Sequence, residues 1–181
     1  MKHGKKYEDM ILIIAHMGGG VSVGIHSHGK VIEVNRALCG LGAMSTTRTG
    51  SINSSKLVEV CFSGKYSKQE IIKMITAEGG FVAYLGTNDA YEVEVKALEG
   101  DEKCKLMVDA FCYQVSLEIS RLAATVKGKV DAILLTGGIA YNKGLMEKAG
   151  IIVISVDEDK LEAWNKNEIA DNYGKKKSDY A

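Results

Sequence analysis

The chain has 181 residues, of which 46% are hydrophobic and 25% are charged, and its formal net charge is zero. This length suits one domain with a substantial core, and the balanced charge gives no bulk attraction to nucleic acid or to an anionic membrane. No apolar run approaches the ~20 residues that cross a bilayer, and the first residues lack the apolar core of a signal peptide. We therefore expect a cytoplasmic protein with neither a nucleic-acid nor a membrane partner, whose four cysteines, without paired spacing, are reduced core residues.

The first part of the chain predicts three strands. Segment 10–16 is continuously apolar, and segments 21–27 and 30–36 alternate between apolar and polar residues. His28-Gly29 lies between the second and third segments as a hairpin turn. Segment 40–51 is rich in glycine and hydroxyl residues, and we expect a polar, flexible loop outside the core.

Helices follow. Their predicted starts are Ser54 or Ser55, Ser67, Asn88 or Asp89, and Asp101, and their predicted ends lie near Phe62, Thr76, Leu98 and Lys127. The last of these helices stops at Gly128 and carries an apolar stripe of residues three and four positions apart: Cys104, Val108, Phe111, Cys112, Val115, Ile119, Leu122 and Val126. Segment 79–86 is expected to be a loop.

The remaining segments complete an α/β pattern. A buried strand over 130–136, a short helix, a strand over 151–154 and a weak helix from about 158 are expected, and the last residues are expected to fray. Three strands in a meander followed by strand, helix, strand and helix predict a mixed sheet of about five strands with helices on its faces. This order is the ribonuclease-H-like layout of nucleases and of the actin-like ATPase group, in which ligands bind at the carboxyl ends of strands.

The clearest functional signal lies between the first two strands. His16 ends the apolar run, and Gly18, Gly19 and Gly20 follow it. Consecutive glycine N–H groups can form an anion-binding concavity, to which a histidine adds a proton donor or a positive charge. The pattern predicts a phosphate site built on a hairpin. The alternative is a tight hairpin turn with a hydrogen-bonded histidine.

Arg48 is a second candidate. It lies in a run of serines and threonines, where a guanidinium can clamp a carboxylate or a transferring phosphoryl group, and the alternative is an ordinary surface-loop arginine. Gly137 and Gly138 end the strand 130–136 and could let a nucleotide approach the backbone, with Asn142 bonding the base or capping the next helix. A purely structural strand-to-helix turn is the alternative.

Two other activities are disfavoured. A nuclease of this layout needs carboxylates on its first strand to bind metal, and segment 10–16 has none. His26 and His28 share a strand face and could hold a metal, but solvated histidines at a hairpin tip are favoured. We assign no metal ligand.

Together these segments resemble the butyrate kinase family, within the acetate-and-sugar-kinase, Hsp70 and actin superfamily. The matching segments are 15–24, 30–35, 62–66, 79–89, 100–103 and 130–142, and segment 82–89 is similar to the butyrate branch. The resemblance implies transfer of a phosphoryl group from ATP to butanoate, giving butanoyl phosphate and ADP, with Mg²⁺. It matches His16 to a histidine beside the phosphoryl group, Arg48 to the arginine that stabilises that group, and Gly18, Gly19 and Gly20 to a phosphate loop. The positions that bind the nucleoside correspond to Asp89, Gly137, Gly138 and Asn142.

Family members have two such domains with the site in the cleft between them, and this chain resembles only the second. We therefore expect a C-terminal nucleotide-binding domain over 1–156, a divergent and partly frayed tail over 157–181, and no N-terminal domain. This implies a truncated or degenerate copy that is poorly active alone, with a short-chain carboxylate as substrate and a complementing N-terminal half as a partner. We also expect a homodimer. The alternative is a module that binds nucleotide, or dimerises through the helix 101–127, without catalysis.

Overall fold

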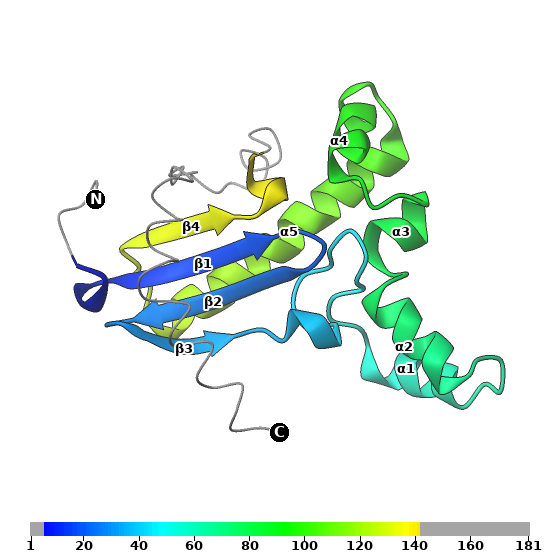
Figure 1. Cartoon of the computed structure of the whole chain (residues 1–181), viewed down its shortest axis with the longest axis horizontal. Coiled ribbons are helices and arrows are strands. Elements are labelled where there is room, and N and C mark those ends of the chain that lie inside the picture. The colour runs from blue at the N-terminus through cyan, green and yellow to red at the C-terminus, as the bar shows by residue number, and fades with distance from the viewer. Residues whose placement is uncertain (1–5, 142–181) are drawn as a thin grey trace.

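Four strands form one mixed sheet in the order β3-β2-β1-β4 (Figure 1). In this computed structural model, which describes residues 6–141, the strands are β1 (Ile11–Met17), β2 (Val21–Ser27), β3 (Lys30–Val34) and β4 (Ala132–Thr136). The first three form an antiparallel meander, and β4 runs parallel to β1. The predicted mixed α/β sheet is confirmed, whereas the strand expected over 151–154 and the tail lie outside the described residues.

The parallel pairing of β1 and β4 brings two strand ends together. Parallel strands have their carboxyl ends at the same edge of a sheet. The register of this pair makes His16 the direct partner of Thr136 at that edge. At the other end of the meander, His28 and Gly29 form the predicted turn with φ angles of 52° and 74°, the left-handed conformation that a two-residue hairpin requires.

The helices follow the predicted order, with one addition. The described residues form α1 (Ser54–Cys61), α2 (Lys68–Thr76), α3 (Gly80–Leu85), α4 (Ala90–Leu98) and α5 (Glu102–Thr125), with short 3₁₀ turns at Tyr7–Asp9, Ala37–Cys39 and Gly138–Tyr141. Ser67, Asp89 and Asp101 cap α2, α4 and α5 as expected. The cap of α1 is Asn53 rather than Ser54 or Ser55, because the Asn53 side chain accepts the N–H groups of Ser55 and Lys56.

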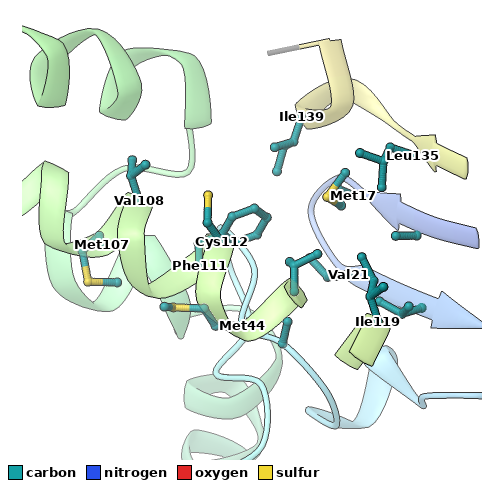
Figure 2. Close-up of a cluster of buried hydrophobic side chains, with 14 of the residues drawn as sticks. Met17, Val21, Met44, Met107, Val108, Phe111, Cys112, Ile119, Leu135 and Ile139 are labelled. Carbon is teal, nitrogen blue, oxygen red and sulfur yellow. The ribbon is translucent and has the colours of Figure 1, made fainter. Parts of the chain in front are cut away.

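Helix α5 lies along one face of the sheet and forms the core with it (Figures 1 and 2). Seven of the eight apolar positions predicted for its stripe are buried, and Val126 is partly buried. Phe81 of α3 meets Phe111 of α5 edge-on, with ring centroids 5.9 Å apart. A smaller apolar cluster around Met10, Leu12 and Ala132 is separate from this main core. No helix among residues 6–141 is long and apolar enough to span a bilayer.

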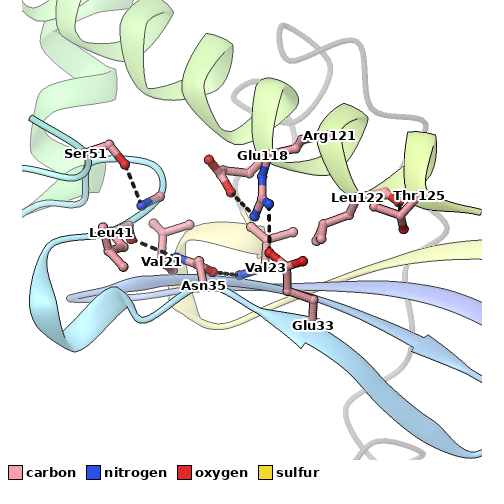
Figure 3. Close-up of polar contacts among 11 residues, drawn as sticks. Val21, Val23, Glu33, Asn35, Leu41, Ser51, Glu118, Arg121, Leu122 and Thr125 are labelled. Carbon is pink, nitrogen blue, oxygen red and sulfur yellow. Dashed lines mark hydrogen bonds and ion pairs between the residues drawn. The ribbon is translucent and has the colours of Figure 1, made fainter.

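The expectation that segment 40–51 lies outside the core is wrong. Ala43, Met44, Ser45 and Thr46 are all buried. The Met44 N–H donates to Gln114 Oε1 of α5 at 2.8 Å, which fastens the segment to the long helix. Asn35 holds its other end, because the Asn35 side chain accepts the N–H of Val23 and donates to the carbonyls of Val21 and Leu41 (Figure 3). Satisfied backbone groups make a polar sequence compatible with burial.

The predicted loop over 79–86 is also wrong, since α3 forms there. The Phe81 and Val82 N–H groups donate to the carbonyls of Ser45 and Thr46 at 3.3 and 3.0 Å. These carbonyls satisfy donors that the first turn of a helix leaves without an intrahelical partner. The start of α3 packs closely against segment 40–51, since a Cβ on Gly80 would lie 1.8 Å from the Ser45 carbonyl oxygen.

The cysteine prediction holds in part. Cys104 and Cys112 are buried on α5, and no disulfide joins the four cysteines. Cys39 and Cys61 are exposed, so the expectation that all four are core residues is wrong.

Candidate functional site

The β1–β2 turn lies at the carboxyl ends of β1 and β4, as the sequence predicts. His16 is exposed there, and its Nδ1 is hydrogen-bonded to Thr136 Oγ1 at 3.0 Å. The other ring nitrogen, Nε2, lies 3.8 Å from the position that a Cβ on Gly18 would take. The imidazole therefore lies alongside the glycine turn and is held from the side of β4.

Side chains of segment 45–48 form hydrogen bonds to the glycine turn. Ser45 Oγ and Thr47 Oγ1 both donate to the Gly19 carbonyl, at 2.6 and 2.9 Å. The Gly18 N–H donates to the Gly20 carbonyl at 2.9 Å, but the N–H groups of Gly19 and Gly20 donate to no group of residues 6–141. Two fixed backbone donors are thus left for an acceptor outside the described chain, which is what an anion-binding turn requires.

Arg48 contacts the same turn. A Cβ on Gly20 would lie 1.9 Å from Arg48 Nη1 and 2.9 Å from Cζ, so the guanidinium occupies the space that any other side chain at this position would take. Arg48 Nε is buried and has no hydrogen-bond partner among the described residues. Ion pairs within the described part of the chain do not include Arg48. A buried guanidinium nitrogen without an acceptor is costly unless a ligand completes its bonding.

The two glycines after β4 have different roles. Gly137 has a φ of +87°, and a Cβ there would lie 2.3 Å from the Met17 carbonyl oxygen. The close approach of β4 to the end of β1 therefore requires a glycine at this position. This supports the structural alternative raised from the sequence, a strand-to-helix turn, for Gly137. Gly138 is exposed, and a Cβ there would meet nothing within 4 Å. Of these two glycines, Gly138 alone leaves open space among residues 6–141.

The remaining nucleoside candidates are not joined to this site by a described contact. Asp89 is exposed at the start of α4, where its carboxylate accepts the N–H groups of Tyr91 and Glu92 at 2.9 and 3.0 Å. Asn142 lies outside the described residues. The structure thus brings together His16, Gly18, Gly19, Gly20, Arg48, Gly137 and Gly138, while Asp89 has a demonstrated role only as a helix cap.

His26 is committed to a structural contact. Its Nδ1 is hydrogen-bonded to the Tyr7 hydroxyl at 2.7 Å, and burial lowers the pKa of its imidazole below the usual value. Within residues 6–141, no three histidine, cysteine or acidic side chains gather so that they could hold a metal ion.

Three hydroxyl residues of this site were not assigned a role from the sequence. Thr136 contacts His16, and Ser45 and Thr47 hold the Gly19 carbonyl. The run of serines and threonines around Arg48 was the available signal. Its meaning depends on the β1–β2 turn, which is more than 20 residues away: the Ser45–Gly19 pair is 26 residues apart in sequence.

Solved kinases share this fold. The crystal structure of Porphyromonas gingivalis acetate kinase matches with a TM-score of 0.75 and 25% identity, covering 82% of this chain and 38% of that one. A propionate kinase from Francisella tularensis matches with a TM-score of 0.66 and 30% identity, covering 77% and 38%. The fold is therefore the actin-like ATPase fold, as the order of elements predicts.

The sequence comparisons give the family. The acetokinase family model matches residues 2–175, and the chain belongs to this family. Butyrate kinase 2 of Clostridium acetobutylicum is 58% identical over 139 residues, and butyrate kinase 1 of the same organism is 54% identical over 140. Each alignment covers 77% of this chain but 39% of the relative, so the chain spans about two fifths of the length of the curated relatives it matches. The family resemblance found in the sequence is confirmed.

Proposed function

We propose that this chain is the nucleotide-binding, C-terminal half of a butyrate-kinase-type phosphotransferase, which transfers a phosphoryl group from ATP to butanoate. The observation that carries the proposal is that the Arg48 guanidinium lies against the glycine turn, and that Arg48 Nε and the N–H groups of Gly19 and Gly20 have no hydrogen-bond partner among residues 6–141. A fixed positive charge and fixed amide donors around one turn are suited to the oxygens of a phosphoryl group.

Each residue has a role in this proposal. The glycine N–H groups bind a phosphate, and Arg48 stabilises charge on the equatorial oxygens as the phosphoryl group moves between donor and acceptor. His16 donates a hydrogen bond to the same group. Gly138 leaves room for the ribose or base, which Asp89 and Asn142 would contact. Phosphoryl transfer depends mainly on positioning and charge stabilisation, so no covalent intermediate on the protein is needed.

Mg²⁺ would be bound mainly through the nucleotide rather than by a dedicated protein site. The described residues offer no cluster of three metal-ligating side chains, and Mg²⁺ in kinases is bound largely through substrate phosphates with one or two carboxylates. We propose that the ion arrives with ATP or ADP and is held mainly by the nucleotide phosphates. When bound, the ion would neutralise phosphate charge.

The chain corresponds to only part of the length of its curated relatives, and the proposed reaction takes this into account. Because the chain covers 39% of its curated relatives, we propose that a complementing half supplies the rest of the carboxylate site.

A module that only binds nucleotide or dimerises is the second candidate. The exposed apolar stripe Leu106, Tyr113 and Leu117 of α5, which are 66%, 65% and 49% exposed, favours an additional contact there, and we propose a homodimer through it.

Nucleotide binding tests the proposal directly. Isothermal titration with Mg·ADP should show weak binding, because half a cleft leaves the ligand partly solvated. Arg48→Gln should abolish the heat, whereas Arg36→Gln, which removes an exposed arginine outside the site, should leave it unchanged. No heat and no chemical-shift change at millimolar ADP would refute the binding claim.

A hydroxamate assay with butanoate and ATP separates the two candidates. The chain alone should form little or no acyl phosphate, and addition of a family N-terminal domain should restore turnover. Turnover that stays absent in a complemented protein that binds Mg·ADP would favour the non-catalytic module.

A further inference from the structure

Thr136 and His16 form a pair that the register of the sheet fixes. They are direct partners across the parallel β1–β4 ladder, and the Thr136 hydroxyl is 3.0 Å from His16 Nδ1. Both residues lie on hydrogen-bonded strand ends whose backbones are already ordered, so little further backbone entropy is lost when their side chains meet. The other ring nitrogen, Nε2, is the one beside Gly18.

The direction of this hydrogen bond decides what Nε2 offers to the turn. If Thr136 donates to Nδ1, the neutral imidazole carries its proton on Nε2, and a donor lies beside the glycine turn. If Nδ1–H donates to Thr136, Nε2 is an acceptor, and the threonine proton has no acceptor among residues 6–141. The two alternatives differ in both bonding and charge.

We propose that Thr136 is a positioning residue that holds neutral His16 in the Nε2–H form. Only this arrangement uses the threonine proton and gives the turn a third donor beside the N–H groups of Gly19 and Gly20. An Nε2 lone pair would instead repel the oxygens of an anion. The imidazolium also carries a proton on Nε2, with Thr136 then accepting from Nδ1, so the donor at Nε2 persists in both protonation states. The role of this donor in binding a phosphoryl group rests on the proposed function, whereas the tautomer can be tested independently of it.

The tautomer is measured by ¹⁵N NMR on the chain without nucleotide. The chain has four histidines, and His16→Asn identifies the His16 signals. For the neutral imidazole, we expect a protonated Nε2 and an unprotonated Nδ1. Thr136→Val, which keeps the shape but removes the hydroxyl, should mix the two tautomers and shift both nitrogens, and Thr136→Ser should restore the original pattern.

Thr76→Val is the matched control, because the Thr76 hydroxyl donates to the Ile72 carbonyl within α2, and it should leave the His16 signals unchanged. A protonated Nδ1 in the original chain would overturn the proposal, and so would a tautomer pattern that Thr136→Val leaves unaltered in a folded protein. Since no nucleotide is present, a chain that shows the expected pattern but binds no Mg·ADP would contradict the proposed function and still support the role of Thr136 in setting the tautomer.

Discussion

Ser45 joins the two halves of the candidate site through one hydroxyl group. Its Oγ donates to the Gly19 carbonyl at 2.6 Å and accepts the N–H groups of Thr47 and Arg48 at 3.3 and 3.0 Å. The side chain is fully buried, with 0% exposure. One small polar group therefore sets the position of both the glycine turn and the backbone of the arginine.

Ser45→Ala should lower the free energy of unfolding by about 1–3 kcal/mol, because it removes three hydrogen bonds of a buried hydroxyl and leaves the N–H groups of Thr47 and Arg48 without this acceptor. Urea unfolding measures this. Ser63→Ala is the matched control, since the Ser63 hydroxyl likewise donates to a backbone carbonyl and accepts a backbone N–H, but at an exposed position. Its effect should stay within about 0.5 kcal/mol. Equal effects of the two substitutions would show that the Ser45 network contributes nothing beyond a surface turn.

The lowered pKa of His26 should make the free energy of unfolding depend on pH. Burial lowers the pKa of the folded His26 below its value of about 6.5 in the unfolded chain. As pH falls, the unfolded state binds the proton first, which favours unfolding. The free energy of unfolding is therefore highest above about pH 6.5 and falls below it as His26 protonates in the unfolded chain. Urea midpoints at about pH 7.5 and about pH 5.5 should differ less in His26→Asn than in the original chain. His28→Asn, at an exposed turn position, should keep the original difference, and an undiminished difference in His26→Asn would contradict the assignment.

At the scale of elements, the junction between β4 and the following turn separates two glycines that look equivalent in the sequence. Gly137→Ala forces a Cβ toward the Met17 carbonyl at a φ of +87°, and we expect a loss of at least about 2 kcal/mol in the free energy of unfolding. Gly138→Ala meets open space and should change stability by less than about 0.5 kcal/mol. Urea unfolding of both variants checks this, and similar losses would mean that β4 does not approach β1 this closely.

At the scale of the whole molecule, the proposed function puts this site on one side of a cleft that an N-terminal domain would complete. In a protein completed by a family N-terminal domain, Arg48→Ala should lower kcat by roughly 10²–10³, the usual loss of a preorganised charge donor. Arg48→Lys should recover part of it, since an ammonium lacks the planar fork of donors. Steady-state kcat and KM for both substrates give the measurement. An unchanged kcat with a raised KM would make Arg48 a substrate clamp instead.

The sequence by itself determined the elements that local patterns encode. The apolar run before His16, the alternating strands, the His28-Gly29 turn and the stripe of α5 all depend on residues within a few positions of one another. The glycine turn and its histidine were placed correctly at a strand end for the same reason, because a strand boundary and a turn are local signals.

Only the tertiary structure decided the rest. Segment 40–51 is buried because Gln114 and Asn35, distant in sequence, satisfy its backbone groups, and α3 forms because the carbonyls of Ser45 and Thr46 accept its first N–H groups. The placement of Arg48 against Gly20 and of Thr136 against His16 depends on the same long-range approach. A sequence window contains a donor or an acceptor but not its distant partner, so these contacts exist only once the strands and helices have packed.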